Sequence, residues 1–521
     1  YEYIYYFYSK FDILSPVLFV MISLLIIYLF KFLYLIFFNR TQGKYLLDIK
    51  ASISKKMFEC YLLKPYSFHI KHNSSLLIRN IESEIGVMIN SFLSPFLVFI
   101  LNSLTVFCIA ILLMFYDFLS TITIISVFLL TAILLNLIFK KKLTDIGKSR
   151  QVHQRFNLQH LRQGFGSIKE IKLLGIENYF INKFNFHNLK LAKVGLKRVV
   201  IGIIPRLTFE YLFLIIIFIL ILSVELSNES FETLLPTLVI YSLCAFRLMP
   251  ALNAITTAYQ KIKYGTAALV IVYEQLPTDQ EININKTNYG KINFNKEINL
   301  KNIYFSYPGS SKQIVNDISL SIQKNKTVGI IGKNGSGKST LLDLVCGLSE
   351  PTSGILEIDG KDIKENLIGW QRTIGYVPQS IYLSDDTLLS NIAIGVDTSK
   401  INKESLTKAI KLAQLDQMVT ELPKGLETMM GEKGINISGG QKQKIGIARV
   451  LYRDPEILIF DEATSSMDLS SEQKFTEDLN KFYSQKTIII VAHRLSALKY
   501  CEKIYHIKSN KIYLEKGLNN I

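Results

Sequence analysis

Residues Gly332–Ser339 read G-K-N-G-S-G-K-S, between an apolar strand pattern at Thr327–Ile331 and a helical pattern at Thr340–Gly347. Glycines at this spacing let backbone N–H groups turn inward around an anion, and the N-terminus of the following helix adds its positive dipole end. We expect Lys338 to reach the β and γ phosphates of a nucleotide and Ser339 to bind Mg²⁺. The residues expected to contact ATP in this stretch are Gly332, Asn334, Gly335, Ser336, Gly337, Lys338, Ser339 and Thr340.

An acidic pair follows a second short apolar run. Ile457–Phe460 has the composition of a buried strand, and Asp461 and Glu462 come directly after it. Asp-Glu pairs are common in proteins and are usually solvated. In a chain that also carries a phosphate loop, their position favours Asp461 as a Mg²⁺ ligand and Glu462 as the general base that polarises the attacking water.

The first half of the chain has a membrane-protein composition. Hydrophobic residues make up 49% of the whole chain, but their long runs lie before about residue 255. A bilayer core about 30 Å thick needs roughly 20 apolar residues in a helix. Five stretches of this length favour membrane helices over buried core helices. They are Ile13–Phe38, Phe92–Tyr116, Phe118–Phe139, Val199–Val224 and Leu234–Ile255.

The charges of the connecting loops predict the topology. Arg40–Asn90 and Lys140–Arg198 are rich in basic residues, whereas the turn near Asp117 and the loop Glu225–Glu232 contain no Lys or Arg. The positive-inside rule then places the two basic loops and the ATP-binding half in the cytosol. Counting back through five crossings puts Tyr1 outside. We therefore expect one further helix before it and six spans in the complete protein.

The overall charge and the cysteines exclude other classes of function. The formal net charge of +16 does not indicate nucleic-acid binding, because the basic residues flank the predicted spans. The five cysteines contain no C-x-x-C pair and have no histidine cluster near them. We therefore expect neither a disulfide framework nor a zinc site.

Further motifs carry a resemblance to a known family. Ile437–Gln441 reads I-S-G-G-Q, Gln379 ends Y-V-P-Q, and His493 follows a third apolar run. Together with the phosphate loop and the acidic pair, they resemble the ATP-binding-cassette exporters, whose signature normally begins with Leu. The resemblance implies that Gln379 senses Mg²⁺, that His493 contacts the γ-phosphate and that Tyr307 stacks on adenine. It also implies that Asp468, in S-S-M-D where S-A-L-D is usual, serves communication within a dimer.

The resemblance implies a dimer and a fold. In this family the signature of one ATP domain closes over the phosphate loop of another, and one chain here has one of each. It therefore implies a homodimer whose two sites use ATP and Mg²⁺, with Ser339, Gln379 and Asp461 around the metal. The signature residues acting in trans are Ser438, Gly439, Gly440 and Gln441.

The implied protein is a multi-domain membrane protein with the type I exporter fold. An all-α transmembrane domain at 1–272 and a linker at 273–298 precede an α/β nucleotide-binding domain at 299–516. We expect it in the bacterial inner membrane, with the ATP domain in the cytosol.

Charged residues in the apolar spans offer a clue to the cargo. Charges in the hydrocarbon core are costly and usually face a cavity or a partner. Lys31, Arg206 and Arg247 lie in or near three different spans, and if they converge they form a positive belt suited to pyrophosphate. Alternatively, Lys31 snorkels to the interface and Arg206 pairs with Glu210 one turn on.

A closer resemblance favours the first alternative. Ile204–Leu212 and Phe246–Asn253 resemble segments of the bacterial lipid-linked oligosaccharide flippases of protein N-glycosylation, the PglK type. The resemblance implies that Arg206 and Arg247 bind the pyrophosphate, with Lys31 in place of a more usual arginine. We therefore expect ATP-driven flipping of a polyprenyl-pyrophosphate-linked oligosaccharide to the outer leaflet. The rival hypotheses are an exporter of drugs, peptides or other lipids, and an ATP-gated channel or regulator.

Overall fold

The computed structural model describes residues 16–116, 118–227, 231–276, 290, 292–310, 312–431, 434 and 437–515. These residues divide into two compact units. The helical unit comprises 16–64 and 68–276, and the α/β unit comprises 65–67 and 290–515. Residues 277–289 and 291, most of the predicted linker, lie outside the described residues. The predicted domain boundaries therefore stay predictions.

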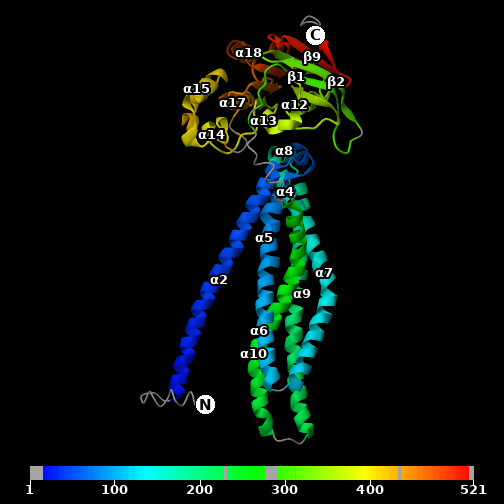
Figure 1. Cartoon of the computed structure of the whole chain (residues 1–521), viewed down its shortest axis with the longest axis vertical. Helices are drawn as coiled ribbons and strands as arrows, with labels where there is room; N and C mark the ends of the chain where they lie inside the picture. Colours follow the sequence, from blue (N-terminus) through cyan, green and yellow to red (C-terminus); the bar gives the residue numbers. More distant parts are fainter. Residues whose placement is uncertain are drawn as a thin grey trace. The chain divides into compact units, whose positions relative to one another are not determined.

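Long helices make up most of the helical unit, as the sequence predicts (Figure 1). They are α2 (Pro16–Leu63), α6 (Ser94–Tyr116), α7 (Phe118–Gly166), α9 (Glu177–Ser227) and α10 (Phe231–Gln275). Four helical stretches of the described residues are long and apolar enough to cross a membrane: Leu18–Leu63, Ser74–Tyr116, Thr121–Gly166 and Glu177–Ile219. The fifth predicted span lies in α10, and its residues 234–238 are outside those whose side chains are described.

Shorter helical segments connect the long helices. They are α3 (Tyr66–Lys71), α4 (Ser74–Arg79), η1 (Asn80–Glu84), α5 (Ile85–Met88), η2 (Ile89–Leu93) and α8 (Ile168–Leu174). η1 and η2 are π-helical turns, so the chain from α4 to α6 is nearly continuous helix.

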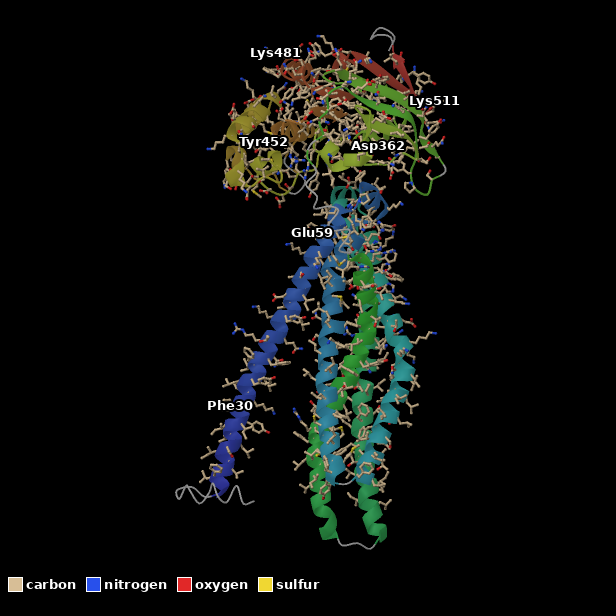
Figure 2. All side chains as sticks on the ribbon, viewed as in Figure 1. Phe30, Glu59, Asp362, Tyr452, Lys481 and Lys511 are labelled. Atoms are coloured by element: carbon tan, nitrogen blue, oxygen red, sulfur yellow. The ribbon has the colours of Figure 1, made fainter. Side chains whose placement is uncertain are left out.

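Helix α2 packs against its own chain mainly through its C-terminal half. Met57 and Tyr61 of α2 form a buried cluster with Ile85 and Met88 of α5 and with Ala268 of α10. The apolar side chains of residues 18–37 are instead largely exposed, and Phe30, labelled in Figure 2, is 69% exposed. An apolar surface of this kind is typical of a helix that faces lipid or another membrane helix.

The α/β unit contains two sheets. The four-stranded antiparallel sheet has the order β2-β1-β4-β5, and the six-stranded sheet has the order β10-β9-β3-β8-β7-β6. The first comprises β1 (Glu297–Ser306), β2 (Gln313–Gln323), β4 (Ser353–Ile358) and β5 (Lys361–Asp362). The second comprises β3 (Thr327–Gly332), β6 (Ile374–Val377), β7 (Ile457–Asp461), β8 (Thr487–Val491), β9 (Lys503–Lys508) and β10 (Lys511–Glu515).

Helices fill the connections between these strands. The α-helices are α12 (Lys338–Val345), α13 (Leu367–Gln371), α14 (Leu388–Ile392), α15 (Lys403–Leu412), α16 (Asp416–Glu421), α17 (Gly439–Tyr452) and α18 (Leu469–Tyr483). The short 3-10 turns are η3 (Ile363–Asn366), η4 (Thr398–Lys400), η5 (Gly425–Glu427) and η7 (Leu495–Leu498).

Both faces of the six-stranded sheet are covered, which explains its continuous apolar strands. In β7, Ile457 and Ile459 belong to one hydrophobic core, and Leu458 and Phe460 belong to the other. Successive side chains of a strand point to opposite faces, so a strand with two covered faces is apolar at every position.

The strands predicted at Thr327–Ile331 and Ile457–Phe460 lie in β3 and β7, which confirms them. The helix predicted to begin at Thr340 begins two residues earlier, at Lys338. The reason is that the loop ends at Gly337, whose φ of +99° is a left-handed conformation.

Glycines in the helical unit permit close packing of α10, and this generates a prediction. A Cβ atom at Gly265 would lie 2.6 Å from Ser91 O, whereas a Cβ at Gly195 of α9 would have no neighbour within 4 Å in the described part of the chain. We expect Gly265→Ala to lower the thermal midpoint of the purified full-length protein in detergent, because overpacking costs about 1–3 kcal/mol. Gly195→Ala is the matched control and should hold or raise the midpoint. Equal midpoints for the two variants would contradict the packing.

Candidate active site

The candidate site lies where parallel strands end. β6, β7, β8 and β3 are neighbours in this order, and each pair is parallel. Their carboxyl ends therefore meet at one edge of the sheet, the usual position for ligands in open α/β sheets. The ends of the four strands and the segments that follow them carry Gln379, Asp461 with Glu462, His493, and Gly332–Thr340.

The phosphate loop has the backbone of an anion nest. Gly335 and Gly337 have φ values of +77° and +99°, a region that favours glycine. A Cβ at Gly332 would lie 2.7 Å from the hydroxyl oxygen of Ser336, so this position also needs glycine. The Ser336 hydroxyl is buried and has no hydrogen-bond partner among the residues that the structure describes. An unpaired buried hydroxyl in a loop of this shape fits an anionic ligand.

Lys338 turns its ammonium group back toward the loop. Its Nζ donates to Gly332 O at 2.8 Å and to Lys333 O at 3.3 Å, and the residue is only 5% exposed. The same Nζ lies 3.8 Å from a carboxylate oxygen of Glu462. The loop, the helix N-terminus and Lys338 together concentrate positive potential where phosphates would bind.

The carboxylate of Glu462 contacts side chains from the other three segments, including Lys338. Gln379 Nε2 donates to Glu462 Oε2 at 2.7 Å, and His493 Nε2 lies 2.8 Å from Glu462 Oε1. His493 Nε2 is also 3.3 Å from Lys338 Nζ. The structure therefore brings together the predicted base, the predicted sensor of Mg²⁺ and the predicted switch histidine.

Glu462 has a strained backbone. Its φ is +52°, a conformation that is uncommon for a residue with a long side chain, and its N–H donates to Val491 O at 3.0 Å. Such conformations cluster at functional sites, where the surrounding structure maintains them. Here the hydrogen bond to the end of β8 holds Glu462 in place.

The carboxyl group of Asp461 interacts with two hydroxyl groups and with a second carboxyl group, that of Asp343. Tyr376 OH donates to Asp461 Oδ2 at 3.0 Å, and the Ser339 hydroxyl is a further partner of Asp461. Burial raises the pKa of Asp461, although these hydrogen bonds lower it in part. Burial, and then the charge of Asp461, raises the pKa of Asp343 in α12 to about 6. Both carboxyl groups therefore hold their protons to a higher pH than solvated carboxyl groups do.

The residues at this edge fit a magnesium nucleotide. Mg²⁺ prefers oxygen ligands and usually binds through one or two protein groups together with substrate phosphates. The Ser339 hydroxyl and the Asp461 carboxylate already contact each other, and they would provide such oxygens. The Gln379 amide, hydrogen-bonded to Glu462, would provide a third.

Tyr307 reaches the helix that follows the phosphate loop. Its hydroxyl lies 3.1 Å from Thr340 Oγ1, and its ring contacts Phe305 edge-on. The predicted stacking of Tyr307 on adenine stays a prediction.

The signature residues begin α17. Gln441 N donates to Ser438 Oγ at 3.2 Å, and Ser438 N donates to Gln441 Oε1 at 3.0 Å, so the two residues form a capping box. A Cβ at Gly440 would lie 3.0 Å from Ser466 O, and Gly439 faces the same residue. Within the described part of the chain, no hydrogen bond joins Ser438–Gln441 to the phosphate loop.

Asp468 is the N-cap of α18. Its carboxylate accepts a hydrogen bond from Ser470 Oγ and another from Ser471 N at 2.9 Å. These bonds, that of Ser470 first, hold the pKa of Asp468 well below its usual range. The residue is therefore a fixed negative charge at physiological pH.

The three predicted cargo-binding residues lie on α2, α9 and α10. Arg206 Nε donates to Glu210 Oε1 at 2.8 Å, which is the pairing expected under the alternative hypothesis. Lys31 Nζ lies 5.0 Å from the ring centroid of Tyr28. Among the residues that the structure describes, no contact joins Lys31, Arg206 and Arg247. Their convergence stays a prediction.

Sequence analysis missed Tyr376 and Asp343 as neighbours of the site. Tyr376 lies in β6 opposite Ile459 of β7, and this strand pairing brings its hydroxyl to Asp461. Asp343 lies in α12, where its face depends on how the helix packs. Only the sheet order and the helix orientation reveal these contacts, and the sequence carries no local signal for either.

Comparison with known proteins agrees with this geometry. The family described as "ABC transporter transmembrane region" matches residues 3–204, and the family described as "ABC transporter" matches residues 315–465. The ATP-dependent lipid A-core flippase of Ralstonia nicotianae is 25% identical over 478 residues, which cover 91% of this chain and 80% of that protein. ABC transporter B family member 21 of Arabidopsis thaliana is 40% identical over 257 residues, 49% of this chain and 20% of that protein.

A solved structure shares the whole fold. The structure of a bacterial Atm1-family ABC exporter with ATP bound matches with a TM-score of 0.82 at 20% identity, covering 96% of this chain and 88% of that chain. This confirms the predicted type I exporter fold. A transmembrane region and one ATP-binding domain thus follow each other in a single chain. The protein therefore belongs to the ABC transporters, as an exporter half-transporter that hydrolyses ATP.

Proposed function

We propose that this protein is a homodimeric flippase that moves a polyprenyl-pyrophosphate-linked oligosaccharide from the inner to the outer leaflet. The observation that carries the ATP-driven part is the carboxylate of Glu462, held between Gln379 and His493 beside the phosphate loop. The cationic side chains Arg206 and Arg247, exposed on apolar helices, support an anionic lipid as cargo.

In the proposed reaction Glu462 is the general base. Its carboxylate accepts a proton from the water that attacks the γ-phosphate, and His493 stabilises the charge that develops there. Lys338, the Ser336 hydroxyl and the backbone of the loop bind the phosphates. Mg²⁺, when bound by Ser339, Gln379 and Asp461, supplies positive charge to the phosphates.

The dimer is proposed because, among the described residues, the signature makes no hydrogen bond to the phosphate loop of its own chain. Ser438–Gln441 form a helix N-terminus, which favours an anion, but their described hydrogen bonds stay local. A second copy would place this N-terminus over the phosphate loop and complete two equivalent sites. Asp468, a fixed charge close to the same region of α17, is then suited to communication between the sites.

The proposed orientation places the α/β unit in the cytosol of a bacterial cell. The basic stretches Arg40–Asn90 and Lys140–Arg198 support it through the positive-inside rule. Homologous proteins named as bacterial lipid A-core flippases support an inner-membrane location.

Those homologues also favour a second candidate cargo. A lipid A-type molecule is a phosphorylated glycolipid, so its anionic group could use the same arginines. Export of other lipids, peptides or drugs on this scaffold remains the broader alternative. Offering both glycolipids to the same proteoliposomes distinguishes the two candidates.

Removing the proposed base should abolish hydrolysis. Glu462→Gln should lower the ATPase kcat by about 100-fold or more, because general-base catalysis contributes about 10²–10⁴-fold. Binding of a fluorescent ATP analogue should persist, since the phosphate loop is untouched. A variant that retains half of the ATPase activity would disprove the assigned role.

Removing the charges of Arg206 and Arg247 should stop transport of the cargo while ATP hydrolysis continues. In proteoliposomes, the double variant Arg206→Gln, Arg247→Gln should abolish flipping of a labelled polyprenyl-pyrophosphate glycan, since each lost charge-assisted hydrogen bond to the cargo costs about 1.5–3 kcal/mol. Its basal ATPase activity should stay within about twofold of the wild type. Lys197→Gln, an exposed basic residue on the same helix as Arg206, is the matched control. Unimpaired flipping by the double variant would refute the pyrophosphate site.

The carboxyl group of Asp343 should make the thermal stability of the protein depend on pH. The pKa of Asp343 is raised to about 6, so its stabilising contribution is full below about pH 4 and is lost as pH rises through 6. Asp343→Asn should therefore raise the thermal midpoint of the nucleotide-free protein at pH 7.5, with the gain shrinking toward pH 4.5. Asp385→Asn, an exposed carboxylate, is the control. A gain that does not depend on pH would contradict this assignment.

A further inference from the structure

A buried carboxylate lies outside the phosphate-binding edge. Glu472 is in the first turn of α18 and is 1% exposed, and Phe475 and Leu479 of the same helix belong to the hydrophobic core. A carboxylate in such surroundings is costly unless hydrogen bonds replace its lost water. Its donors must come from the segments packed against α18.

Three donors satisfy this carboxylate. Thr464 Oγ1 donates to Glu472 Oε1 at 2.7 Å, and Ser496 Oγ donates to Glu472 Oε2 at 2.9 Å. Arg494 Nη1 also donates to Oε2, at 3.4 Å. One oxygen is therefore bound to the segment after β7, and the other to the segment after β8.

These two segments carry the proposed catalytic side chains. Thr464 follows Glu462 by two residues, and Arg494 directly follows His493. The last paired residues of the two strands are Asp461 and Val491, and one further backbone hydrogen bond, from Glu462 N to Val491 O, follows this pair. The carboxylate of Glu472 connects the segments where the backbone ladder has ended.

The same network reaches the turn before α18. Arg494 Nη1 donates to Met467 O at 3.1 Å, and Met467 immediately precedes Asp468. The position of Asp468 is thus connected to the segment of His493 through one guanidinium group.

We propose that Glu472 is a positioning residue for ATP hydrolysis, which holds the segment carrying Glu462 against the segment carrying His493. This rests on the roles proposed above for those two residues. Glu462 and His493 are 2.8 Å apart, a separation that depends on both segments. Since a misplacement of about 1 Å can cost about 100-fold in rate, a weakened connection should lower kcat measurably.

A purely structural role for Glu472 makes a different prediction. An ion pair with Arg494 that only stabilises the fold would change the thermal midpoint and leave the kcat of the folded protein unchanged. A positioning role changes kcat at nearly constant KM for ATP, because the phosphate loop is not altered.

The test compares two glutamates of α18 in the full-length protein. Glu472→Gln removes an acceptor from the network, and Glu477→Gln removes the same charge from an exposed position of the same helix. We expect Glu472→Gln to lower kcat about tenfold with KM for ATP within about twofold, and Glu477→Gln to match the wild type. A folded Glu472→Gln variant whose kcat stays within about twofold of the wild type would overturn the proposal.

Milder variants keep the test decisive if Glu472→Gln does not fold. Thr464→Val and Ser496→Ala each remove one hydrogen bond, and each should lower kcat about threefold. Unchanged kcat in both would overturn the proposal. A double-mutant cycle adds a second criterion, because Glu472→Gln should cost less activity in a His493→Ala background. Full additivity would show that Glu472 does not act through His493.

Glu462→Gln measured in parallel separates this inference from the proposed function. If Glu462→Gln retains hydrolysis, the assigned roles are wrong whatever Glu472 does. If Glu462→Gln is inactive and Glu472→Gln resembles the wild type, only the positioning role of Glu472 fails.

Discussion

The parallel pairing of β3, β8, β7 and β6 is the constraint on which the rest of the site depends. Each strand is covered on both faces, so the sheet cannot shift its register without exposing apolar side chains. The pairing delivers four loops to one edge, although they are as far apart in sequence as Gly332 and His493. The chemistry of the molecule is therefore a consequence of strand order, and the long helices add the membrane context in which it operates.

Carboxyl groups that are buried or half-buried are the second organising feature of the α/β unit. Glu462, Asp461 and Glu472 each lie in the α/β unit with hydrogen-bond donors from other segments, and none is balanced by a simple surface pair. Each carboxylate therefore fixes the relative position of loops that the sheet itself does not hold. The strained backbone of Glu462 fits this arrangement, because strain persists where surrounding contacts over-determine a conformation. The ATP site is thus pre-organised by groups that also determine its fold.

The sequence predicts much of this protein because its strongest signals are local. The spacing of glycines in Gly332–Ser339 predicted the strand, loop and helix, and the apolar run before Asp461 predicted β7. It could not predict the contact of Tyr376 with Asp461 or the partners of Glu472, because these depend on sheet order and helix packing. Nor could it choose between the two hypotheses for Arg206. The structure places Arg206 beside Glu210, while the convergence of Arg206 with Arg247 stays a prediction.

The central claim is that hydrolysis of ATP at this edge drives net movement of an anionic glycolipid. The most direct test is to measure the movement of a labelled polyprenyl-pyrophosphate glycan across proteoliposome membranes that contain the full-length protein. ATP is compared with a non-hydrolysable analogue at equal occupancy. The account predicts continued flipping with ATP and none beyond a single turnover with the analogue. Sustained flipping with the analogue would contradict it and would indicate a passive, ATP-gated pathway.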